Sequence, residues 1–394
     1  MPFMRSAFGR LLEPLDRRVI ARAVAVHEGD RGVGDGENAW TCERHLKTLL
    51  FAQFAGLASL RQIVEALGSQ PAAFYHLNLR APARSTLSDA NAQRPAAVFA
   101  AVAEALLPVA AGALRREGER LIRLLDSTPI MLGAEQFPWA ERSARIRGLK
   151  LHLLYDPREM RPVWFALSSA KVDDVVAGRA VPLEAGALYV FDKGYTDHRW
   201  WAAIIAAGGR FLTRKKRNAH TRLVAERPTA GAPVLADRLV QAGHRRPHAG
   251  APENPLYHTI LREIVVAREG SAEPLVLLTS DLDLPAAQIA RLYKERWQIE
   301  LLFKWLKQNL KIRRFWGRSE NAVKIQIYTA LIAFLLLRIL HHTAARACKT
   351  GPMLLLTRLK FTLLRPLDFR RRAKPPPRPP CLRPPHPQYR FAFP

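Results

Sequence analysis

The stretch YKERWQIELLFKWLK, residues 293–307, repeats two kinds of side chain at the spacing of a helix. Its polar members recur every three or four residues: Tyr293, Arg296, Glu300, Lys304 and Lys307. A neighbouring apolar set keeps a helical spacing as well: Leu292, Ile299, Phe303, Leu306 and Leu310. At about 100° per residue, each set forms one face of a single long helix. The apolar face is therefore predicted to pack on a core, while the polar face stays accessible.

The polar face of this helix combines one carboxylate with several cations and a phenol. A carboxylate binds divalent metal ions, and Arg, Lys and Tyr side chains bind phosphates. The face is therefore typical of metal-dependent phosphoryl transfer on a nucleic acid. The alternative is an ordinary solvated surface, because charged side chains at this spacing often form weak pairs of roughly 0.2–0.5 kcal/mol each.

The net charge indicates what kind of partner the chain has. Among its 394 residues, 61 are Lys or Arg and 34 are Asp or Glu, which leaves a formal charge of +27. Such an excess predicts a polyanionic partner, with nucleic acid first and an anionic membrane second. Hydrophobic residues make up 48% of the chain, which is enough for a folded core. A structural nucleic-acid binder would carry the same charge, so the charge by itself does not indicate an enzyme.

Cysteine usage and hydropathy indicate a cytoplasmic protein. Cys42, Cys348 and Cys381 lie too far apart for a Cys-rich zinc site and argue against a disulfide framework, as in a reducing compartment. Arginines interrupt the beginning of the chain, so no secretory signal is predicted there. The most apolar run, 327–337, is about half of a membrane span and ends at Arg338. It predicts a buried helix and no membrane partner.

Composition divides the chain into four predicted parts. Residues 1–40 are charged and Gly-rich, and we expect them to form a flexible arm. Residues 41–115 show helical periodicity with capping signals, typical of a small DNA-binding domain. From 116 to 345, strand and helix patterns follow one another, with a loop-rich insertion at about 214–274. Residues 346–394 are basic and Pro-rich, which predicts an extended tail.

The part between 116 and 345 predicts a mixed α/β sheet. Its apolar segments indicate strands at 121–126, 149–155, 162–167, 187–192, 210–213, 257–266 and 275–279. Helices are expected near Asp174, at 198–207 and from Pro285 onward.

Two of these predicted strands end on an acid, Asp126 and Asp192. A carboxylate at the end of a buried strand is costly unless it is ligated or hydrogen-bonded, and a single one is most often a turn-capping Asp. Together with Glu300, however, these residues supply three carboxylates in a strongly basic protein. Two divalent ions about 4 Å apart need such shared carboxylates.

These motifs, in this order, resemble the DDE transposases of the insertion-sequence-four family. The residues that carry the resemblance are Asp126-Ser127-Thr128, Phe191-Asp192-Lys193-Gly194-Tyr195, Phe211-Leu212-Thr213-Arg214, the set Tyr293, Arg296, Glu300 and Lys307, and Ser319-Glu320-Asn321-Ala322-Val323-Lys324 with the apolar helix after it. The similarity covers roughly 42–345. The stretch Arg84-Ser85-Thr86-Leu87-Ser88-Asp89-Ala90-Asn91 resembles the helical domain that often precedes the catalytic domain in that family.

The resemblance implies a ribonuclease-H-like mixed sheet, interrupted by a strand-rich insertion and preceded by a small helical domain. It implies that Asp126, Asp192 and Glu300 are the catalytic residues and that they bind two Mg²⁺ or Mn²⁺ ions. The residues expected to bind DNA are Tyr293, Arg296, Trp297, Lys304, Lys307, Arg214 and Arg84.

One position departs from the family pattern. Members often carry His-Asp after the third strand, where this chain has Asp173-Asp174. Asp174 matches, while Asp173 replaces the usual His, so any role of that His is absent here. Neither residue is assigned to the metal ions.

The sequence thus predicts a transposase that binds the terminal inverted repeats of its insertion sequence. It would cleave DNA at these ends and join the 3′-hydroxyl to target DNA by two-metal phosphoryl transfer. Its expected partners are double-stranded DNA, as ends and as target, and a second copy of the chain in a synaptic homodimer. Its expected location is the bacterial cytoplasm, at the nucleoid. Two alternatives stay open: a domesticated metal-dependent DNA endonuclease without strand transfer, and a catalytically inactive DNA-binding relative.

Overall fold

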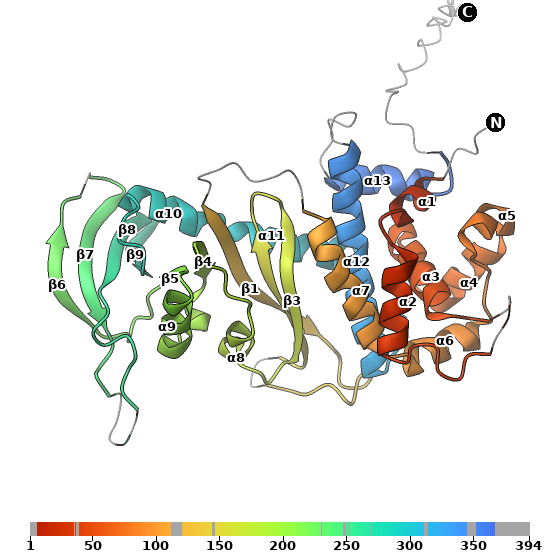
Figure 1. The fold of residues 1–394 in the computed structure, drawn as a ribbon, viewed down its shortest axis with the longest axis horizontal. Helices are drawn as coiled ribbons and strands as arrows, with labels where there is room; N and C mark the ends of the chain where they lie inside the picture. Colours follow the sequence, from red (N-terminus) through yellow and green to blue (C-terminus); the bar gives the residue numbers. More distant parts are fainter. Residues whose placement is uncertain are drawn as a thin grey trace, which may run out of the picture.

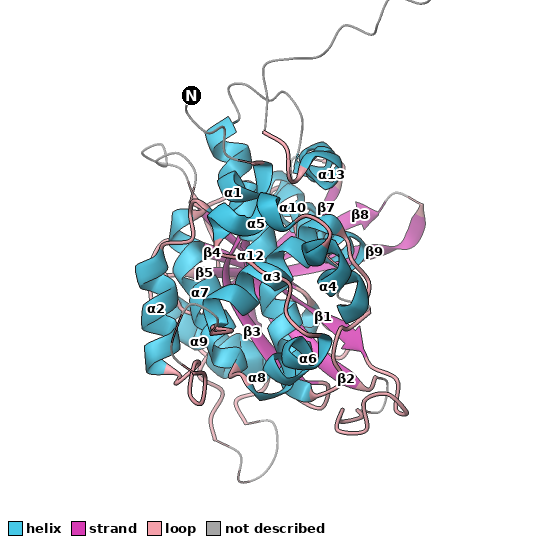
Figure 2. Ribbon diagram, turned by 90° about the vertical axis from the view of Figure 1, so that its right-hand side faces the viewer, coloured by secondary structure: helices cyan, strands magenta, loops and turns pink. Residues whose placement is uncertain are grey.

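The computed structural model shows a sheet in the middle and at one end of the molecule, and a group of helices at the other end (Figure 1). It describes residues 6–34, 36, 39–111, 120–143, 146–229, 231–246, 250, 252–268, 270–310, 314–344 and 352–366. Viewed from the helical end, the N-terminal helices lie in front of the sheet (Figure 2).

The described residues form the following elements. The helices are α1 (Ala7–Leu12), α2 (Arg17–Val26), α3 (Cys42–Ala55), α4 (Leu60–Gly68), α5 (Pro71–Phe74), α6 (Arg84–Gln93), α7 (Ala96–Val109), α8 (Asp174–Arg179), α9 (His198–Ala206), α10 (Ala286–Glu295), α11 (Trp297–Asn309), α12 (Glu320–Ala344) and α13 (Pro352–Thr362), with short 3-10 turns η1 (Tyr75–Leu77) and η2 (Lys193–Tyr195). The strands are β1 (Leu121–Met131), β2 (Gly148–Asp156), β3 (Arg161–Ser169), β4 (Ala187–Phe191), β5 (Arg210–Arg214), β6 (Thr221–Arg227), β7 (Val234–Ala242), β8 (Leu261–Arg268) and β9 (Ser271–Thr279).

The described strands form one sheet in the order β3-β2-β1-β4-β5-β9-β8-β7-β6. β1, β2 and β3 are antiparallel neighbours, whereas β4 and β5 run parallel to β1. These five strands form the ribonuclease-H-like mixed sheet that the sequence predicted. The predicted insertion does not form a separate layer, because β9, β8, β7 and β6 extend the same sheet beyond β5. The sequence analysis indicated neither β6 nor β7. Most of β6 is exposed and lacks apolar alternation.

Alternation along β1 creates one core on each face of the sheet, because successive side chains of a strand point to opposite faces. Leu124 packs in the same core as Ile299 of α11, whereas Leu125 packs in the core that contains Trp200 of α9. α8 and α9 therefore lie on one face of the sheet, and α10 and α11 lie on the other (Figure 1). Asp126, two positions after Leu124, faces α11.

The prediction of a flexible arm at 1–40 is wrong for the described residues 6–34. Two helices form there, and the side chains of Ser6 and Asp16 cap their first turns. Phe8 and Ile20 are buried. The prediction failed because the arginines alternate with apolar residues at helical spacing, and the charged composition hid the amphipathic pattern.

α12 joins the helical region to the sheet. It packs on α3, α6 and α7, and Tyr328 lies against Phe165 of β3 with ring centroids 5.8 Å apart. Within the described part of the chain, one helix is long and apolar enough to cross a membrane, but 89% of its apolar window, in α12, is buried inside the fold. The prediction of a buried helix at 327–337 is therefore confirmed. Because α12 shares one core with α3 and α7, the boundary predicted at 115 does not separate two cores.

The predicted tail contains a folded helix, α13. Its side chains Leu355 and Leu359 are buried and belong to the core around α12. The prediction of an extended tail is therefore wrong for 352–366, where leucines at helical spacing were masked by the Pro-rich composition that follows. The rest of the predicted tail, 346–351 and 367–394, lies outside the described residues.

Leu336→Ala, in the buried middle of α12, should lower the free energy of unfolding by about 2–5 kcal/mol. The reason is that the deleted methyl groups leave a cavity in a core that the sheet and the helical region share. Urea unfolding followed by circular dichroism measures the change. Leu301→Ala, at a leucine of α11 that is 51% exposed, is the matched control and should change stability by less than about 0.5 kcal/mol. Equal effects of the two variants would contradict a common core around α12.

Candidate active site

The pairing of β1 with β4 brings two predicted acids together. The strands run parallel with Leu125 opposite Phe191, so Asp126 lies beside Asp192, the first residue after β4. The prediction that the first of these strands ends on Asp126 is wrong, because β1 stays paired with β2 as far as Met131. Both side chains lie on the face that α11 covers, since each is two positions after a residue of that core. Strand order, which joins segments far apart in sequence, therefore creates this pair of carboxylates.

The long helix expected from Pro285 is interrupted at Arg296, which corrects the prediction of a single helix. α10 ends and α11 begins there, although Arg296 keeps helical backbone angles of φ −51° and ψ −30°. The Arg296 N–H donates to the carbonyl of Tyr293 at 3.2 Å, and the Ile299 N–H donates to the carbonyl of Arg296 at 3.2 Å. These three-residue steps are tighter than α-helical ones. From this segment, Tyr293 reaches Asp192, just after β4, and Arg296 reaches Asp126, within β1.

Arg296 connects two of the three predicted catalytic acids. Its Nη1 donates to Asp126 Oδ2 at 3.1 Å, and its Nη2 donates to Glu300 Oε1 at 2.6 Å. The third acid is held by Tyr293, whose hydroxyl donates to Asp192 Oδ1 at 3.3 Å. The structure thus brings Asp126, Asp192 and Glu300 together around two side chains of the same helical segment.

Burial changes the acid–base properties of this cluster. The Asp126 side chain is 18% exposed, and burial raises its pKa from 3.8 to about 6, although the Arg296 charge opposes the shift. The negative charges of Glu300 and Asp192 add to the rise. Burial, followed by the charge of Asp192, raises the pKa of the Tyr293 hydroxyl to about 12. Tyr293 therefore stays a hydrogen-bond donor, and Asp126 lacks enough positive charge around it.

This deficit of positive charge fits a divalent cation. Three carboxylates supply the oxygen ligands that Mg²⁺ and Mn²⁺ prefer. Among the described residues, however, no three His, Cys, Asp or Glu side chains already converge at metal-ligand spacing. The Arg296 guanidinium lies between Asp126 and Glu300 and neutralises part of their charge. The donor set thus fits a metal ion on condition that Arg296 moves away from the two carboxylates.

The remaining predicted DNA-binding residues lie at different distances from the acids. Trp297 is 59% exposed, beside Arg296, and Lys304 is exposed one turn beyond Glu300, with Lys307 half-buried in the following turn. Arg214 ends β5, the strand next to Asp192, on the same edge of the sheet. Arg84 is not part of this group, because it lies on α6 in the helical region.

Three further residues support Asp126 from the opposite face of the sheet. The Ser127 N–H donates to Asp126 Oδ1 at 2.8 Å, and the Ser127 hydroxyl donates to Asp174 Oδ1 at 3.0 Å. The Lys150 ammonium donates to the same oxygen at 3.2 Å and to the carbonyl of Val172 at 2.8 Å. Asp174 at the start of α8 therefore fixes the residue next to the buried carboxylate.

Sequence reasoning did not assign Ser127, Asp174 or Lys150 to the site. A signal was present in β2, where Lys150 and His152 alternate with leucines in an otherwise apolar strand. Such polar positions on one face of a buried strand need partners. The partner could not be identified without the register that pairs β2 with the end of β1.

Comparison with known proteins finds relatives for most of the chain. The sequence pattern of the transposase DDE domain matches residues 117–336, and that of a domain of unknown function, DUF4372, matches residues 4–80. A Sinorhizobium fredii protein named as transposase y4zB is 42% identical over 311 residues, which cover 77% of this chain and 83% of that protein. A Geobacillus stearothermophilus protein named as a transposase for insertion sequence element IS5377 is 27% identical over 223 residues, 56% of either chain.

Among solved structures, the piggyBac transposase synaptic complex with hairpin DNA is similar at a TM-score of 0.49 and 10% identity. The alignment covers 95% of this chain and 83% of that chain. The family assignment therefore depends on the sequence relatives.

Asp126→Asn is expected to stabilise the protein at pH 7 in the presence of a metal chelator. The folded pKa of Asp126 is about 6 and its ordinary value is 3.8, so the stability that this carboxyl contributes at low pH is lost as the pH rises through 6. An uncharged amide avoids that loss, which is worth about 1–3 kcal/mol at pH 7 and becomes small near pH 4. Urea unfolding at the two pH values measures the difference.

Asp156→Asn is the matched control, because Asp156 ends the neighbouring strand β2 and is also buried. Its carboxylate accepts from Arg123 Nη1 at 2.7 Å and from the Arg158 N–H at 3.0 Å. Loss of these bonds should destabilise the protein by about 1–3 kcal/mol. A comparable destabilisation by Asp126→Asn at pH 7 would mean that Asp126 is a structural capping residue.

Proposed function

This chain belongs to the DDE transposases of insertion sequences, and from that membership we propose its substrate and its reaction. Enzymes of this family cut and join DNA. The proposed substrate is the pair of terminal inverted repeats that bound the chain's own insertion sequence. The proposed reaction is cleavage at these ends, followed by attack of the freed 3′-hydroxyl on target DNA.

The observation that supports this function most strongly is the meeting of Asp126, Asp192 and Glu300 beside Arg296 and Tyr293. These carboxylates are the proposed ligands of two Mg²⁺ or Mn²⁺ ions. When bound, such a pair activates the attacking oxygen and stabilises the leaving oxygen of a phosphoryl transfer.

We propose that Arg296 has one role before a metal ion binds and another role after it binds. Without a metal ion, it compensates part of the charge of Asp126 and Glu300. Once a metal ion compensates that charge, the guanidinium is available for a phosphate of the DNA, to which it can donate two parallel hydrogen bonds. The exposed Lys304 and the half-buried Lys307 extend the cationic face for the next phosphates. Trp297 offers an exposed ring for contact with a base or sugar.

The remaining partners follow from the reaction. Because two ends of one element must be cut and joined together, we propose a homodimer that holds both ends, acting at the nucleoid in the bacterial cytoplasm. Arg214, at the end of β5, is proposed to bind DNA on the other side of the acids.

The N-terminal helices are proposed to take part in recognition of the ends, with Arg84 as one exposed contact at the start of α6. Truncation before 120 is not a valid test of this role. It would remove α3 and α7 and expose the apolar faces of α12 that they cover. Substitutions within the full chain are therefore required.

Asp126→Asn or Glu300→Gln should reduce cleavage of end DNA by about a thousandfold or more with Mn²⁺, because the lost ligand removes several kcal/mol of transition-state stabilisation. Affinity for the same DNA should change less than about threefold, since neither change removes a cation. Gel assays of cleavage and of DNA binding measure the two effects separately.

The Asp156→Asn variant is the control for these acids and should retain cleavage where it folds. Loss of DNA binding with residual cleavage would contradict the assignment of the acids. Cleavage by the native chain without any joined product would favour an endonuclease that lacks strand transfer.

Asp174→Asn and Lys150→Met should each lower the cleavage rate by about 10–100-fold, because residues that orient a metal ligand typically contribute that much. Cleavage as a function of Mn²⁺ concentration should show a weaker apparent metal affinity. Lys171→Met is the matched control, because this lysine pairs with Glu141 on the surface, where both side chains are about half exposed. Full activity of the Lys150 variant at every Mn²⁺ concentration would show that the Ser127–Asp174–Lys150 cluster serves the fold alone.

A further inference from the structure

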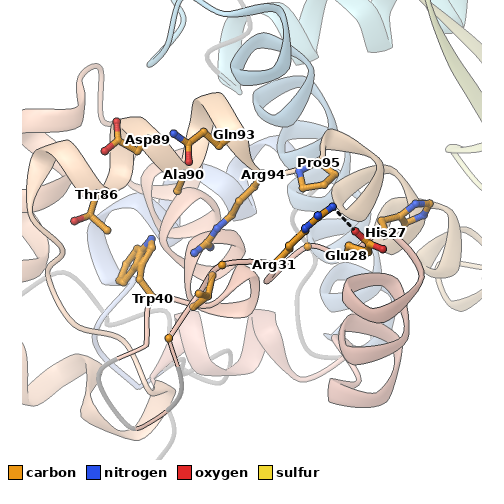
Figure 3. A pocket seen from close by; sticks show the side chains of 14 residues that line it. His27, Glu28, Arg31, Trp40, Thr86, Asp89, Ala90, Gln93, Arg94 and Pro95 are labelled. Atoms are coloured by element: carbon orange, nitrogen blue, oxygen red, sulfur yellow. Dashed lines mark hydrogen bonds and ion pairs between the residues drawn. The ribbon is translucent and has the colours of Figure 1, made fainter.

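A cavity of about 600 Å³ lies in the helical region, between the segment matched by the domain of unknown function and α6, which follows that segment. Its wall combines the loop after α2, the residue Trp40 before α3 and one face of α6. Figure 3 shows Arg94 extending from the end of α6 into the space between Trp40 and Arg31. None of these residues belongs to the acid cluster.

Two buried hydrogen-bond donors of this cavity have no acceptor among the residues that the structure describes. Arg94 is 8% exposed, and its Nη1 has no partner. The indole Nε1 of Trp40 is also buried without a partner. A buried donor without an acceptor costs about 1–3 kcal/mol, and more where it carries charge. Two such donors at one cavity indicate a missing group that accepts hydrogen bonds.

The charge around Arg94 indicates that the missing group is an anion. Asp30 is the acid that acts on the guanidinium, and its Oδ1 already accepts from the Cys42 N–H at 2.6 Å. Cys42 adds no negative charge, because burial raises the pKa of its thiol to about 12. A water molecule could accept from Arg94 but would add no negative charge to that of Asp30.

The acids among the described residues of the rim do not cancel this preference for an anion. Glu28 pairs with Arg31 at 3.2 Å, and Asp89 is exposed on α6. Gly32 has left-handed backbone with φ +74°, and a Cβ there would meet no atom within 4 Å. The loop backbone is thus open at the cavity, so a ligand can approach it closely.

We propose that this cavity binds a phosphate group of nucleic acid, with Arg94 and Trp40 as the donors. Arginine is well suited to phosphate oxygens, and a cavity of this volume can also admit the attached sugar. The inference builds on the proposed function, since it places one contact to the end DNA in the helical region. Residues 1–111 hold 12 Lys and Arg against 10 Asp and Glu, so this region binds by a local site and not by a general positive field.

The test is a scan of end DNA with single neutral methylphosphonates, using the full chain. Replacement of one particular phosphate by a methylphosphonate should lower the affinity of the native protein for the DNA about tenfold. Trp40→Phe and Arg94→Met should bind unmodified DNA more weakly and should no longer respond to the modification at that phosphate. Arg18→Gln, which removes an exposed arginine of α2 away from the cavity, is the matched control and should keep the native response.

Trp40→Phe keeps the ring and removes the N–H, so it preserves the test if Arg94→Met fails to fold. The proposal would be overturned if, at every phosphate, the methylphosphonate lowered the affinity of Trp40→Phe as much as it lowered that of the native protein. Thermal shifts with inorganic phosphate and with a deoxynucleoside monophosphate distinguish the source. Stabilisation by these free compounds without a coupled phosphate in DNA would overturn the assignment to DNA.

Cleavage of end DNA by the native chain separates this proposal from the proposed function. If the native chain cuts its ends and the scan shows no coupled phosphate, the cavity assignment alone fails. If the native chain neither binds nor cuts end DNA, the proposed function fails first.

Discussion

The active-site region depends on one guanidinium that lies between two carboxylates. Arg296 joins Asp126, in the middle of strand β1, to Glu300 in the first turn of α11. Without it, the charges of Asp126, Glu300 and the neighbouring Asp192 would repel one another in a poorly solvated place. The pKa of Asp126 stays near 6 even with Arg296 present, so the arginine compensates part of the charge. The site is thus stable enough to fold and retains a preference for a cation.

Because side chains of β1 alternate between the two faces of the sheet, the residues around Asp126 connect to helices on both faces. Asp126 faces α11, while Ser127, the next residue, faces α8 and bonds to Asp174. Two successive positions of β1 therefore carry the predicted catalytic acid on one face of the sheet and its support on the other. The insertion strands extend the sheet beyond β5, on the side away from β1 and β4. On the other side, α12 packs the sheet against the helical region, so the two regions are parts of one core.

The sequence by itself determined the residue types and the local patterns. Apolar runs ending on Asp126 and Asp192 predicted two buried strands with costly terminal charges. Both strands are present, but β1 continues past Asp126 to Met131. The polar spacing from Tyr293 to Lys307 predicted which face of the helical segment would meet them. Family resemblance then supplied the ribonuclease-H-like order of strands. The predictions of a flexible arm and of an extended tail were wrong because they used composition instead of periodicity. The arginines near the first helices and the prolines after α13 obscured the helical spacing of the apolar residues.

The tertiary structure decided which side chains meet. The sequence could not show that Arg296 interrupts the helix and bridges two acids, because both acids compete for its charge only after β1 and α11 pack together. Nor could it show that Lys150 supports Ser127 through Asp174, because strand register brings these distant residues together. The cavity beside Arg94 is another feature that the sequence could not show. Burial leaves Nη1 of Arg94 without an acceptor, and burial is a property of the folded chain, not of the local sequence.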